Sequence, residues 1–232
     1  MVQARLMTKQ QKVTVRMEWM EQLFSVDWFR PAGCALGAYF LGCFAVGYYL
    51  VRARTGNDIR ELGSGSVGAR NVGRVLGKSG FVFTVLGDLT KGALAVWFAA
   101  EFTNYNRLAM AMATLAVVAG HIWPAQLHFR GGKGVATSFG ALLMFDHRVA
   151  LTILALFLGG SFITRKSLFP AMFAFVCLPL ADWCFNHDGL TTTIMIILTV
   201  IILFAHRKNL AAEFAVFGAR HATAPEGEQP RL

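Results

Sequence analysis

The chain has 232 residues, of which 55% are hydrophobic and only 15% are charged. Soluble globular domains carry about 25% charged residues, so this composition, with a mean hydropathy of +0.50, excludes an ordinary soluble protein. The apolar runs are continuous rather than alternating, which argues against a β-barrel. The formal net charge of +9 fits the basic cytoplasmic loops of a membrane protein better than nucleic-acid binding. We therefore expect an all-α integral membrane protein with no nucleic-acid partner.

Residues 1–30 form a polar and then amphipathic extension that lacks the apolar core and cleavage site of a signal peptide. Seven apolar segments follow, and we expect each to be a transmembrane helix, although a bilayer takes about 20 helical residues and the fourth and fifth segments are short. These segments are Ala32–Val51, Phe81–Ala100, Leu108–Phe129, Gly134–Phe145, Val149–Ile163, Leu168–Phe185 and Leu190–Ala205. The transmembrane domain is thus expected over residues 31–210, with a polar C-terminal tail at 211–232.

Seven spans place the intervening segments alternately on two sides of the membrane. One side receives fourteen Lys and Arg residues, within segments 52–79, 130–133, 164–167 and 206–232, whereas the short turns of the other side hold only Arg107 and Arg148. The positive-inside rule makes the first side cytoplasmic, which puts the C-terminus in the cytoplasm and the N-terminus outside. The five cations of residues 1–30 oppose this orientation.

The longest polar interruption, Leu62–Ser79, contains five glycines together with Arg70, Arg74 and Lys78. Glycine-rich backbone exposes successive N–H groups that bind anions, and Arg adds forked donors suited to phosphate. The alternative is a flexible basic loop that only sets the topology. A nucleotide-binding P-loop is rejected, because Gly73–Ser79 has three residues instead of four before its Gly-Lys pair and no strand precedes it.

Two further polar segments are expected on the same face. Arg130–Thr137 surrounds Lys133 with glycines at the start of a helix, where free N–H groups and the helix dipole favour phosphate. His206 and Asn209 share one helix face and could hydrogen-bond a polyol or a phosphate. For both segments the alternative is a topology signal or an interfacial anchor. Convergence on one face nevertheless favours a shared site.

Asp88 and Lys91 lie inside the second predicted span, where charges are costly and indicate function by default. We favour a mutual ion pair between them, since they lie at i and i+3. His121 is either a site residue or a helix histidine with its hydrogen bonds satisfied. The four cysteines lie in apolar spans without zinc-ligand spacing and are interpreted as buried free thiols. No metal and no cofactor are expected.

Four stretches together resemble the bacterial acyl-phosphate:glycerol-3-phosphate acyltransferase family: GSGSVGARNVGR, the Asp88–Lys91–Gly92 pattern, GHIWPAQLHFRGGKGVAT and HRKN. The resemblance runs from about residue 32 to residue 210. It implies a seven-helix enzyme of the bacterial inner membrane whose active site faces the cytoplasm. It also implies transfer of an acyl group from acyl phosphate to the sn-1 hydroxyl of glycerol 3-phosphate, which gives lysophosphatidate for phospholipid synthesis.

The resemblance implies Ser64, Arg74, Lys133, His206 and Asn209 as the main site residues. Ser64 and adjacent glycine amides would hold a substrate phosphate, while Arg74 and Lys133 would neutralise phosphates. His206 and Asn209 would bind and orient glycerol phosphate. Asp88 and Lys91 are candidates for intramembrane support, and the remaining candidates for phosphate binding are Gly63, Gly65, Gly68, Asn71, Gly131, Gly132, Gly134 and His121.

The chain departs from the family pattern GSGNxGATN at two positions, where Ser66 replaces Asn and Arg70 replaces Thr. The added guanidinium could change the choice of substrate or tighten phosphate binding. The HxxxxD pattern of soluble-type acyltransferases is absent, which excludes a His–Asp base in that arrangement. A substrate phosphate could itself take the hydroxyl proton. The expected partners are acyl phosphate, glycerol 3-phosphate and membrane lipid, with the chain acting as a monomer.

Three alternatives to this function stay open. A phosphate-ester transporter would suit glycine-broken helices and intramembrane charges, although no inverted repeat is visible and the polar motifs crowd one face. A non-catalytic lipid binder could use the basic face alone. A diverged member of the family could acylate another acceptor.

Overall fold

The computed structural model describes the backbone of residues 28–222 and the side chains of residues 28–215. Most of the predicted N-terminal extension, and residues 223–232 of the predicted tail, lie outside this range. All regular structure in the described range is helical. The elements are α2 (Phe29–Cys43), α3 (Val46–Thr55), η2 (Ile59–Glu61), α4 (Ala69–Phe102), α5 (Arg107–Ile122), η3 (Ala125–Leu127), α6 (Val135–Phe145), α7 (His147–Thr164), α8 (Leu168–Asn186) and α9 (Gly189–Ala222).

Six helical stretches are long and apolar enough to cross a membrane: Phe29–Thr55, Ala69–Phe102, Arg107–Leu127, His147–Thr164, Leu168–Asn186 and Gly189–Ala215. Helix α6 is equally apolar but has only 11 residues. Each apolar segment singled out in the sequence therefore contains a helix, and the all-α membrane class is confirmed.

Some predicted boundaries were wrong. The first apolar segment is interrupted, because α2 ends at Cys43 and α3 begins at Val46. The third ends as a helix at Ile122 rather than at Phe129, since Pro124 lacks an N–H and disfavours helical backbone in the residue before it. The polar stretch Leu62–Ser79 is a loop only in its first part. Helix α4 begins within it at Ala69 and is broken at Gly77, whose φ of 74° only glycine adopts readily.

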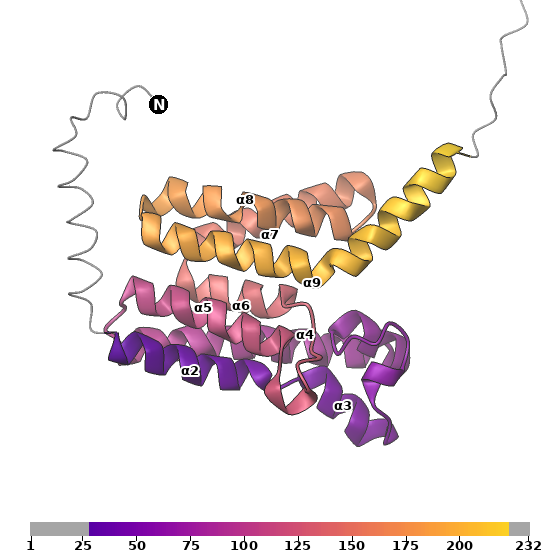
Figure 1. Ribbon diagram of the computed structural model, residues 1–232, viewed down its shortest axis with the longest axis horizontal. Coiled ribbons are helices and arrows are strands. Elements are labelled where there is room, and N and C mark those ends of the chain that lie inside the picture. The colour runs from indigo at the N-terminus through magenta and orange to yellow at the C-terminus, as the bar shows by residue number, and fades with distance from the viewer. Residues whose placement is uncertain (1–27, 223–232) are drawn as a thin grey trace, which may run out of the picture.

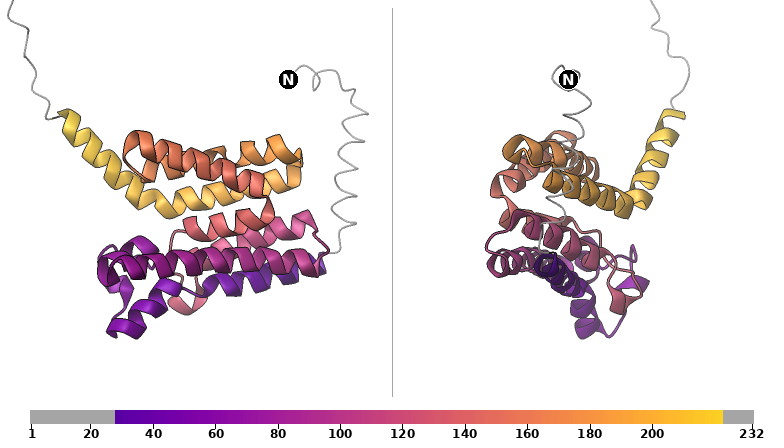
Figure 2. Two further views of the ribbon diagram at one scale, coloured as in Figure 1. Left: turned by 180° about the vertical axis from the view of Figure 1, so that it is seen from behind. Right: turned by 60° about the vertical axis from the view of Figure 1, so that its left-hand side comes forward.

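The helices form two layers, with α7, α8 and α9 lying over a layer made of α2, α4, α5 and α6 (Figures 1 and 2). Within the second layer the helix backbones nearly touch. A Cβ at Gly92 of α4 would collide with the carbonyl oxygen of Thr137 in α6, and one at Gly120 of α5 would collide with that of Tyr39 in α2. Small residues at such crossings let membrane helices gain van der Waals contact. This layer is thus a tightly packed platform.

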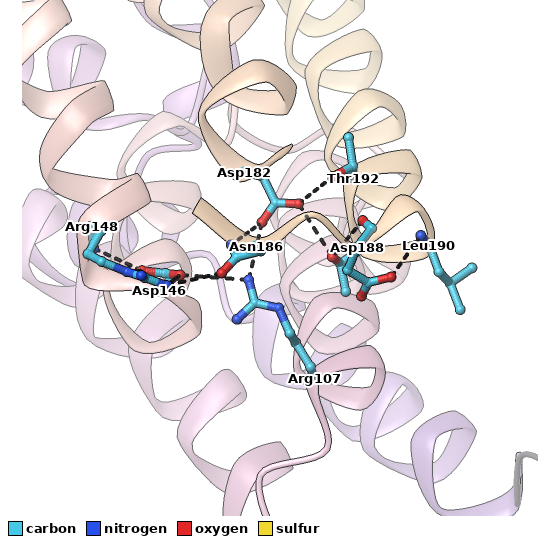
Figure 3. Close-up of polar contacts among 9 residues, drawn as sticks. Arg107, Asp146, Arg148, Asp182, Asn186, Asp188, Leu190 and Thr192 are labelled. Atoms are coloured by element: carbon cyan, nitrogen blue, oxygen red, sulfur yellow. Dashed lines mark hydrogen bonds and ion pairs between the residues drawn. The ribbon is translucent and has the colours of Figure 1, made fainter. Parts of the chain in front are cut away.

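A polar network joins the two layers at one end of the bundle (Figure 3). Arg107, at the start of α5, places Nη2 3.3 Å from Oδ1 of Asp182 in α8. Asp182 is fully buried and accepts further hydrogen bonds from Asn186 at 2.9 Å and Thr192 at 2.8 Å. Because these partners come from α5, α8 and α9, the network fixes the upper layer on the lower one.

Asp146 extends this network to the junction of α6 and α7 (Figure 3). Its carboxylate accepts from the backbone N–H of Arg148 at 3.0 Å and from Arg148 Nη2 at 2.8 Å, and it lies 3.7 Å from Arg107 Nη2. Burial opposes ionisation of Asp146, but the hydrogen bonds from Arg148 outweigh it and lower the pKa of Asp146 to about 2. The carboxylate is therefore charged at neutral pH and anchors α7.

We expect Asp182→Ala to lower the free energy of unfolding by about 3 kcal/mol, because it removes the buried acceptor of Asn186 and Thr192 and leaves Arg107 with only Asp146, at 3.7 Å. Thermal unfolding in detergent measures this effect. Asp188→Ala is the matched control, since the Asp188 carboxylate accepts from the backbone N–H of Leu190 at the start of α9, and losing such a cap costs about 1 kcal/mol. Equal unfolding temperatures for the two variants would contradict a role of the network in joining the layers.

Acid should weaken the fold in part through Asp146. Its pKa of about 2 in the folded chain is below the value of about 3.9 for an unfolded aspartate, so its contribution is complete above about pH 4. That contribution is lost as the pH falls from about 4 towards 2. Asp146→Asn should therefore lower the unfolding temperature at pH 7 but flatten its dependence on pH below 4. A variant that keeps the full acid dependence would contradict this assignment.

Candidate active site

Asn71, in the first turn of α4, determines the shape of the glycine-rich loop before it. Its buried side-chain amide accepts from the N–H of Ser64 at 2.9 Å and donates to three backbone carbonyls, those of Ile59, Leu62 and Ser66. A Cβ at Gly63 would collide with Asn71 Oδ1, and the φ of 56° at Gly63 also favours glycine. The oxygen and the nitrogen of this amide are thus both used to hold the loop and Ser64 in place.

The cations of this segment divide into two groups. Arg60 pairs with Asp58 at 2.5 Å and donates to the carbonyl oxygen of Leu127 at 2.9 Å, and its hydrogen bonds lower the pKa of the Asp58 carboxyl. Arg60 therefore fastens the loop to η3. Arg70 and Arg74 lie one turn apart on α4 and both line the cavity described below. Only these two arginines of the segment are placed to meet a substrate.

The second glycine segment is held against the end of α5. The N–H groups of Gly131 and Gly132 donate to the carbonyl oxygens of Ile122 and His121, each at 3.0 Å, and a Cβ at Gly132 would collide with His121 Nε2. The loop thus passes so close to the His121 imidazole that only glycine fits at position 132. This close approach sets the position of the next residue, Lys133.

Lys133 is half-buried beside the two arginines of α4. Burial lowers the pKa of Lys133, and the positive charges of Arg70 and Arg74 lower it further. Both effects disfavour the charged form, so an anion that enters between these three groups relieves repulsion as well as forming hydrogen bonds. The arrangement is that of an anion site.

A buried charged cluster lies behind the site. Lys91 Nζ is 2.9 Å from Asp88 Oδ1 and 2.8 Å from His121 Nδ1, and all three side chains are at most 5% exposed. The mutual ion pair expected for Asp88 and Lys91 is present. Lys91 also donates to the carbonyl oxygens of Gly42 and Phe44, at 3.1 and 2.8 Å, where α2 ends.

A cavity of about 460 Å³ joins these parts. Its polar end contains all five main residues implied by the sequence, and α9 contributes His206 and Asn209. The full polar lining is Ser64, Ser66, Gly68, Arg70, Asn71, Arg74, Asp88, His121, Lys133, Gly134, Ser167, His206 and Asn209. The other candidates do not line the cavity and belong to its supporting backbone or to the buried cluster: Gly63, Gly65, Gly131, Gly132 and Lys91.

The other end of the cavity is an apolar chamber between the two layers. Its walls come from Phe81, Val85 and Leu89 of α4, Val135, Phe139 and Leu142 of α6, Ile153, Leu154 and Phe157 of α7, and Leu168, Ala171, Ala174 and Phe175 of α8. A cavity that is cationic at one end and apolar at the other suits an anion that carries a hydrocarbon chain. No group of three or more His, Cys, Asp or Glu side chains within residues 28–215 is placed to hold a metal ion.

The sequence did not reveal the chamber or Ser167. Apolar residues occur on every face of a membrane helix, so the stripe of Leu168, Ala171 and Phe175 carries no periodic signal. Ser167 was detectable in principle, since it lies in segment 164–167, which was assigned to the same face as the site. Only the cations of that segment were considered, because they determine the predicted topology.

The helices and the cavity define an integral membrane protein with a built site for an amphipathic anion. A family model described as glycerol-3-phosphate acyltransferase matches residues 32–215. The glycerol-3-phosphate acyltransferase 1 of Desulfitobacterium hafniense (strain Y51) is 41% identical over 175 residues, which cover 75% of this chain and 86% of that protein. The glycerol-3-phosphate acyltransferase of Clostridioides difficile (strain 630) is 40% identical over 181 residues, 76% of this chain and 88% of that one. The chain belongs to the glycerol-3-phosphate acyltransferase family.

Solved structures agree with this assignment. The crystal structure of PlsY, an integral membrane glycerol 3-phosphate acyltransferase, in its glycerol 3-phosphate form superposes with a TM-score of 0.73 at 28% identity, over 80% of this chain and 92% of that one. Its lysophosphatidic acid form gives a TM-score of 0.71 at 27% identity.

We expect Gly132→Ala to reduce activity at least about tenfold, because the new Cβ must displace the His121 imidazole or the backbone that carries Lys133, and a shift of about 1 Å can cost 10²-fold. Steady-state acyltransfer rates in detergent measure the loss. Gly159→Ala, where no atom lies within 4 Å of the added Cβ, is the matched control and should keep full activity. Full activity of Gly132→Ala would show that this close approach does not position Lys133.

Proposed function

We propose that this chain transfers an acyl group from acyl phosphate to the sn-1 hydroxyl of glycerol 3-phosphate, giving lysophosphatidate and inorganic phosphate. The observation that carries the proposal is the single cavity in which a cationic end, with five residues from three distant segments, continues into an apolar chamber. Membership in the family and the glycerol-3-phosphate acyltransferase activity named for its relatives support the same reaction.

The donor would lie along the cavity, with its acyl chain in the apolar chamber. Burying the chain there is favourable by about 0.8 kcal/mol per CH₂ group. Its phosphate would reach the polar end, where Arg74 offers forked donors, Lys133 a point charge and the Ser64 loop its hydroxyl and backbone. The scissile carbonyl would then sit at the junction between the two ends.

The acceptor would bind against α9. His206 and Asn209 both line the polar end, and His206 Nδ1 is 2.9 Å from the carbonyl oxygen of Ile202. That contact fixes the imidazole ring and leaves its Nε2 available to a hydroxyl of glycerol 3-phosphate. Asn209 supplies both a donor and an acceptor for the polyol. Together they would orient the sn-1 hydroxyl towards the acyl carbon.

The reaction needs no covalent enzyme intermediate, because acyl phosphate is already activated. The sn-1 oxygen attacks the acyl carbonyl carbon, the bond from that carbon to the phosphate oxygen breaks, and the hydroxyl proton passes to the departing phosphate. Positioning of the two reactants and neutralisation of their charges by Arg74 and Lys133 supply the rate enhancement.

We infer the orientation from the distribution of charge. With α6 as a seventh, short crossing element, the N-terminus is outside, the C-terminus is cytoplasmic and the site opens to the cytoplasm of a bacterial inner membrane. The cations that line the polar end support this orientation, since Lys and Arg concentrate in cytoplasmic segments. The exposed apolar helix faces would contact the surrounding lipid. The chain is proposed to act as a monomer.

Lys133→Ala should lower acyl transfer by at least about 10²-fold, the loss typical of removing one group that stabilises transition-state charge. Purified protein is incubated with acyl phosphate and glycerol 3-phosphate, and lysophosphatidate and free phosphate are both quantified. Lys78→Ala is the matched control, because Lys78 is an exposed lysine that does not line the cavity, and it should retain activity.

Two results would contradict the proposal. Full activity of Lys133→Ala would contradict the assignment of Lys133 to the active site. Release of phosphate by the unaltered protein without lysophosphatidate would show a different acceptor, and uptake of phosphate ester into vesicles without acyl transfer would indicate a transporter.

A further inference from the structure

Arg70 makes a hydrogen bond across the mouth of the cavity. Its Nη2 donates to Ser167 Oγ at 2.7 Å, between residues 97 positions apart. Arg70 is the second residue of α4, and Ser167 immediately precedes α8, so the bond links the two layers at the site end of the bundle. Both residues line the cavity.

This bond lies where the polar end meets the apolar chamber. From Ser167 the lining continues along α8 through Leu168, Ala171 and Phe175, and the facing wall on α4 is Phe81, Val85 and Leu89. A hydrocarbon chain held between these walls would present its head group at the level of Arg70 and Ser167. The acceptor residues His206 and Asn209 belong to a different helix.

The charge of Arg70 has no carboxylate partner among residues 28–215, since none of the ion pairs there includes it. Its positive charge instead contributes to lowering the pKa of Lys133, so the two cations lie within electrostatic reach. A guanidinium held by a neutral hydroxyl next to other cations gains more from a dianion than from its present partner.

We propose that Arg70 is a specificity-determining residue for the acyl donor, whose guanidinium leaves Ser167 and binds the donor phosphate when the chain occupies the chamber. This inference rests on the proposed reaction and adds a third cation to Arg74 and Lys133. In this structure the Arg70–Ser167 bond bridges the cavity, and a bound donor would replace that bridge with charge-assisted hydrogen bonds.

The test is the KM for each substrate in Arg70→Gln and Arg70→Lys. Arg70→Gln should raise the KM for acyl phosphate about tenfold or more, as expected for a lost hydrogen bond to a charged group. The KM for glycerol 3-phosphate and kcat should change less than about threefold. Arg70→Lys keeps the positive charge but loses the planar guanidinium. Its KM for acyl phosphate should therefore lie between those of the unaltered protein and Arg70→Gln. Lys78→Gln removes a cation from the same helix outside the cavity and should leave both KM values unchanged.

To distinguish phosphate binding by Arg70 from a purely structural role of the Arg70–Ser167 bond, Arg70→Gln is measured again in a Ser167→Ala background. If Arg70 binds phosphate, the rise in donor KM persists there, because any contribution of Ser167 itself cancels in the comparison. Disappearance of the effect would show that the bridge alone matters and would overturn the proposal. So would an equal rise in the KM for glycerol 3-phosphate, or an unchanged donor KM.

The proposed reaction and the role of Arg70 fail in distinguishable ways. Absence of lysophosphatidate from the unaltered protein refutes the reaction. An active unaltered protein together with an Arg70→Gln variant of normal donor KM refutes only the role of Arg70. Unfolding temperatures of all variants in detergent exclude misfolding as the cause of a changed KM.

Discussion

A break in a helix within a membrane leaves backbone carbonyls without partners, and each such group costs several kcal/mol in hydrocarbon. In this protein Lys91 and Gln126 meet that demand at the end of α2, where they donate to the carbonyl oxygens of Gly42, Cys43 and Phe44. A buried lysine in turn requires an anion, which Asp88 supplies one turn earlier on the same helix. The break between α2 and α3 therefore depends on a charge pair placed on α4.

The same cluster reaches the site. His121 lies against both Asp88 and Lys91, and the opposite edge of its imidazole faces Gly132, just before Lys133. A continuous series of contacts thus runs from the end of α2 to the principal lysine of the cavity. The buried charges of this cluster fix the backbone that presents Lys133, whereas Arg70, Arg74 and Lys133 line the cavity itself.

Stability and binding are concentrated at opposite ends of the bundle. At one end Arg107 and Asp182 join the layers through opposite charges and satisfied hydrogen bonds. At the other end Arg70, Arg74 and Lys133 bring like charges together around the cavity. Because the first end holds the layers together, the second end can tolerate like charges close to one another.

Alternation of loops across the membrane predicted that three polar segments would share one face, and the structure brings all three to one cavity. The end of α5 at Ile122 was missed, although Pro124 is a local signal for it. The break after α2 was not readable, because its stabilising partners Lys91 and Gln126 are distant in sequence and no local signal marks Phe44. The role of Arg60 was not readable for the same reason, since one of its partners is the carbonyl of Leu127.

Repulsion among the cations has a consequence for catalysis. Burial and the charges of Arg70 and Arg74 lower the pKa of Lys133, and the negative charge of a bound phosphate would oppose both effects. Protonation of Lys133 and binding of the anion are therefore linked, each favouring the other. In the proposed reaction negative charge would grow on the departing phosphate as its bond to the acyl carbon breaks, and the same cations would stabilise that state more strongly than the ground state. Binding stronger in the transition state than in the ground state is what accelerates a reaction.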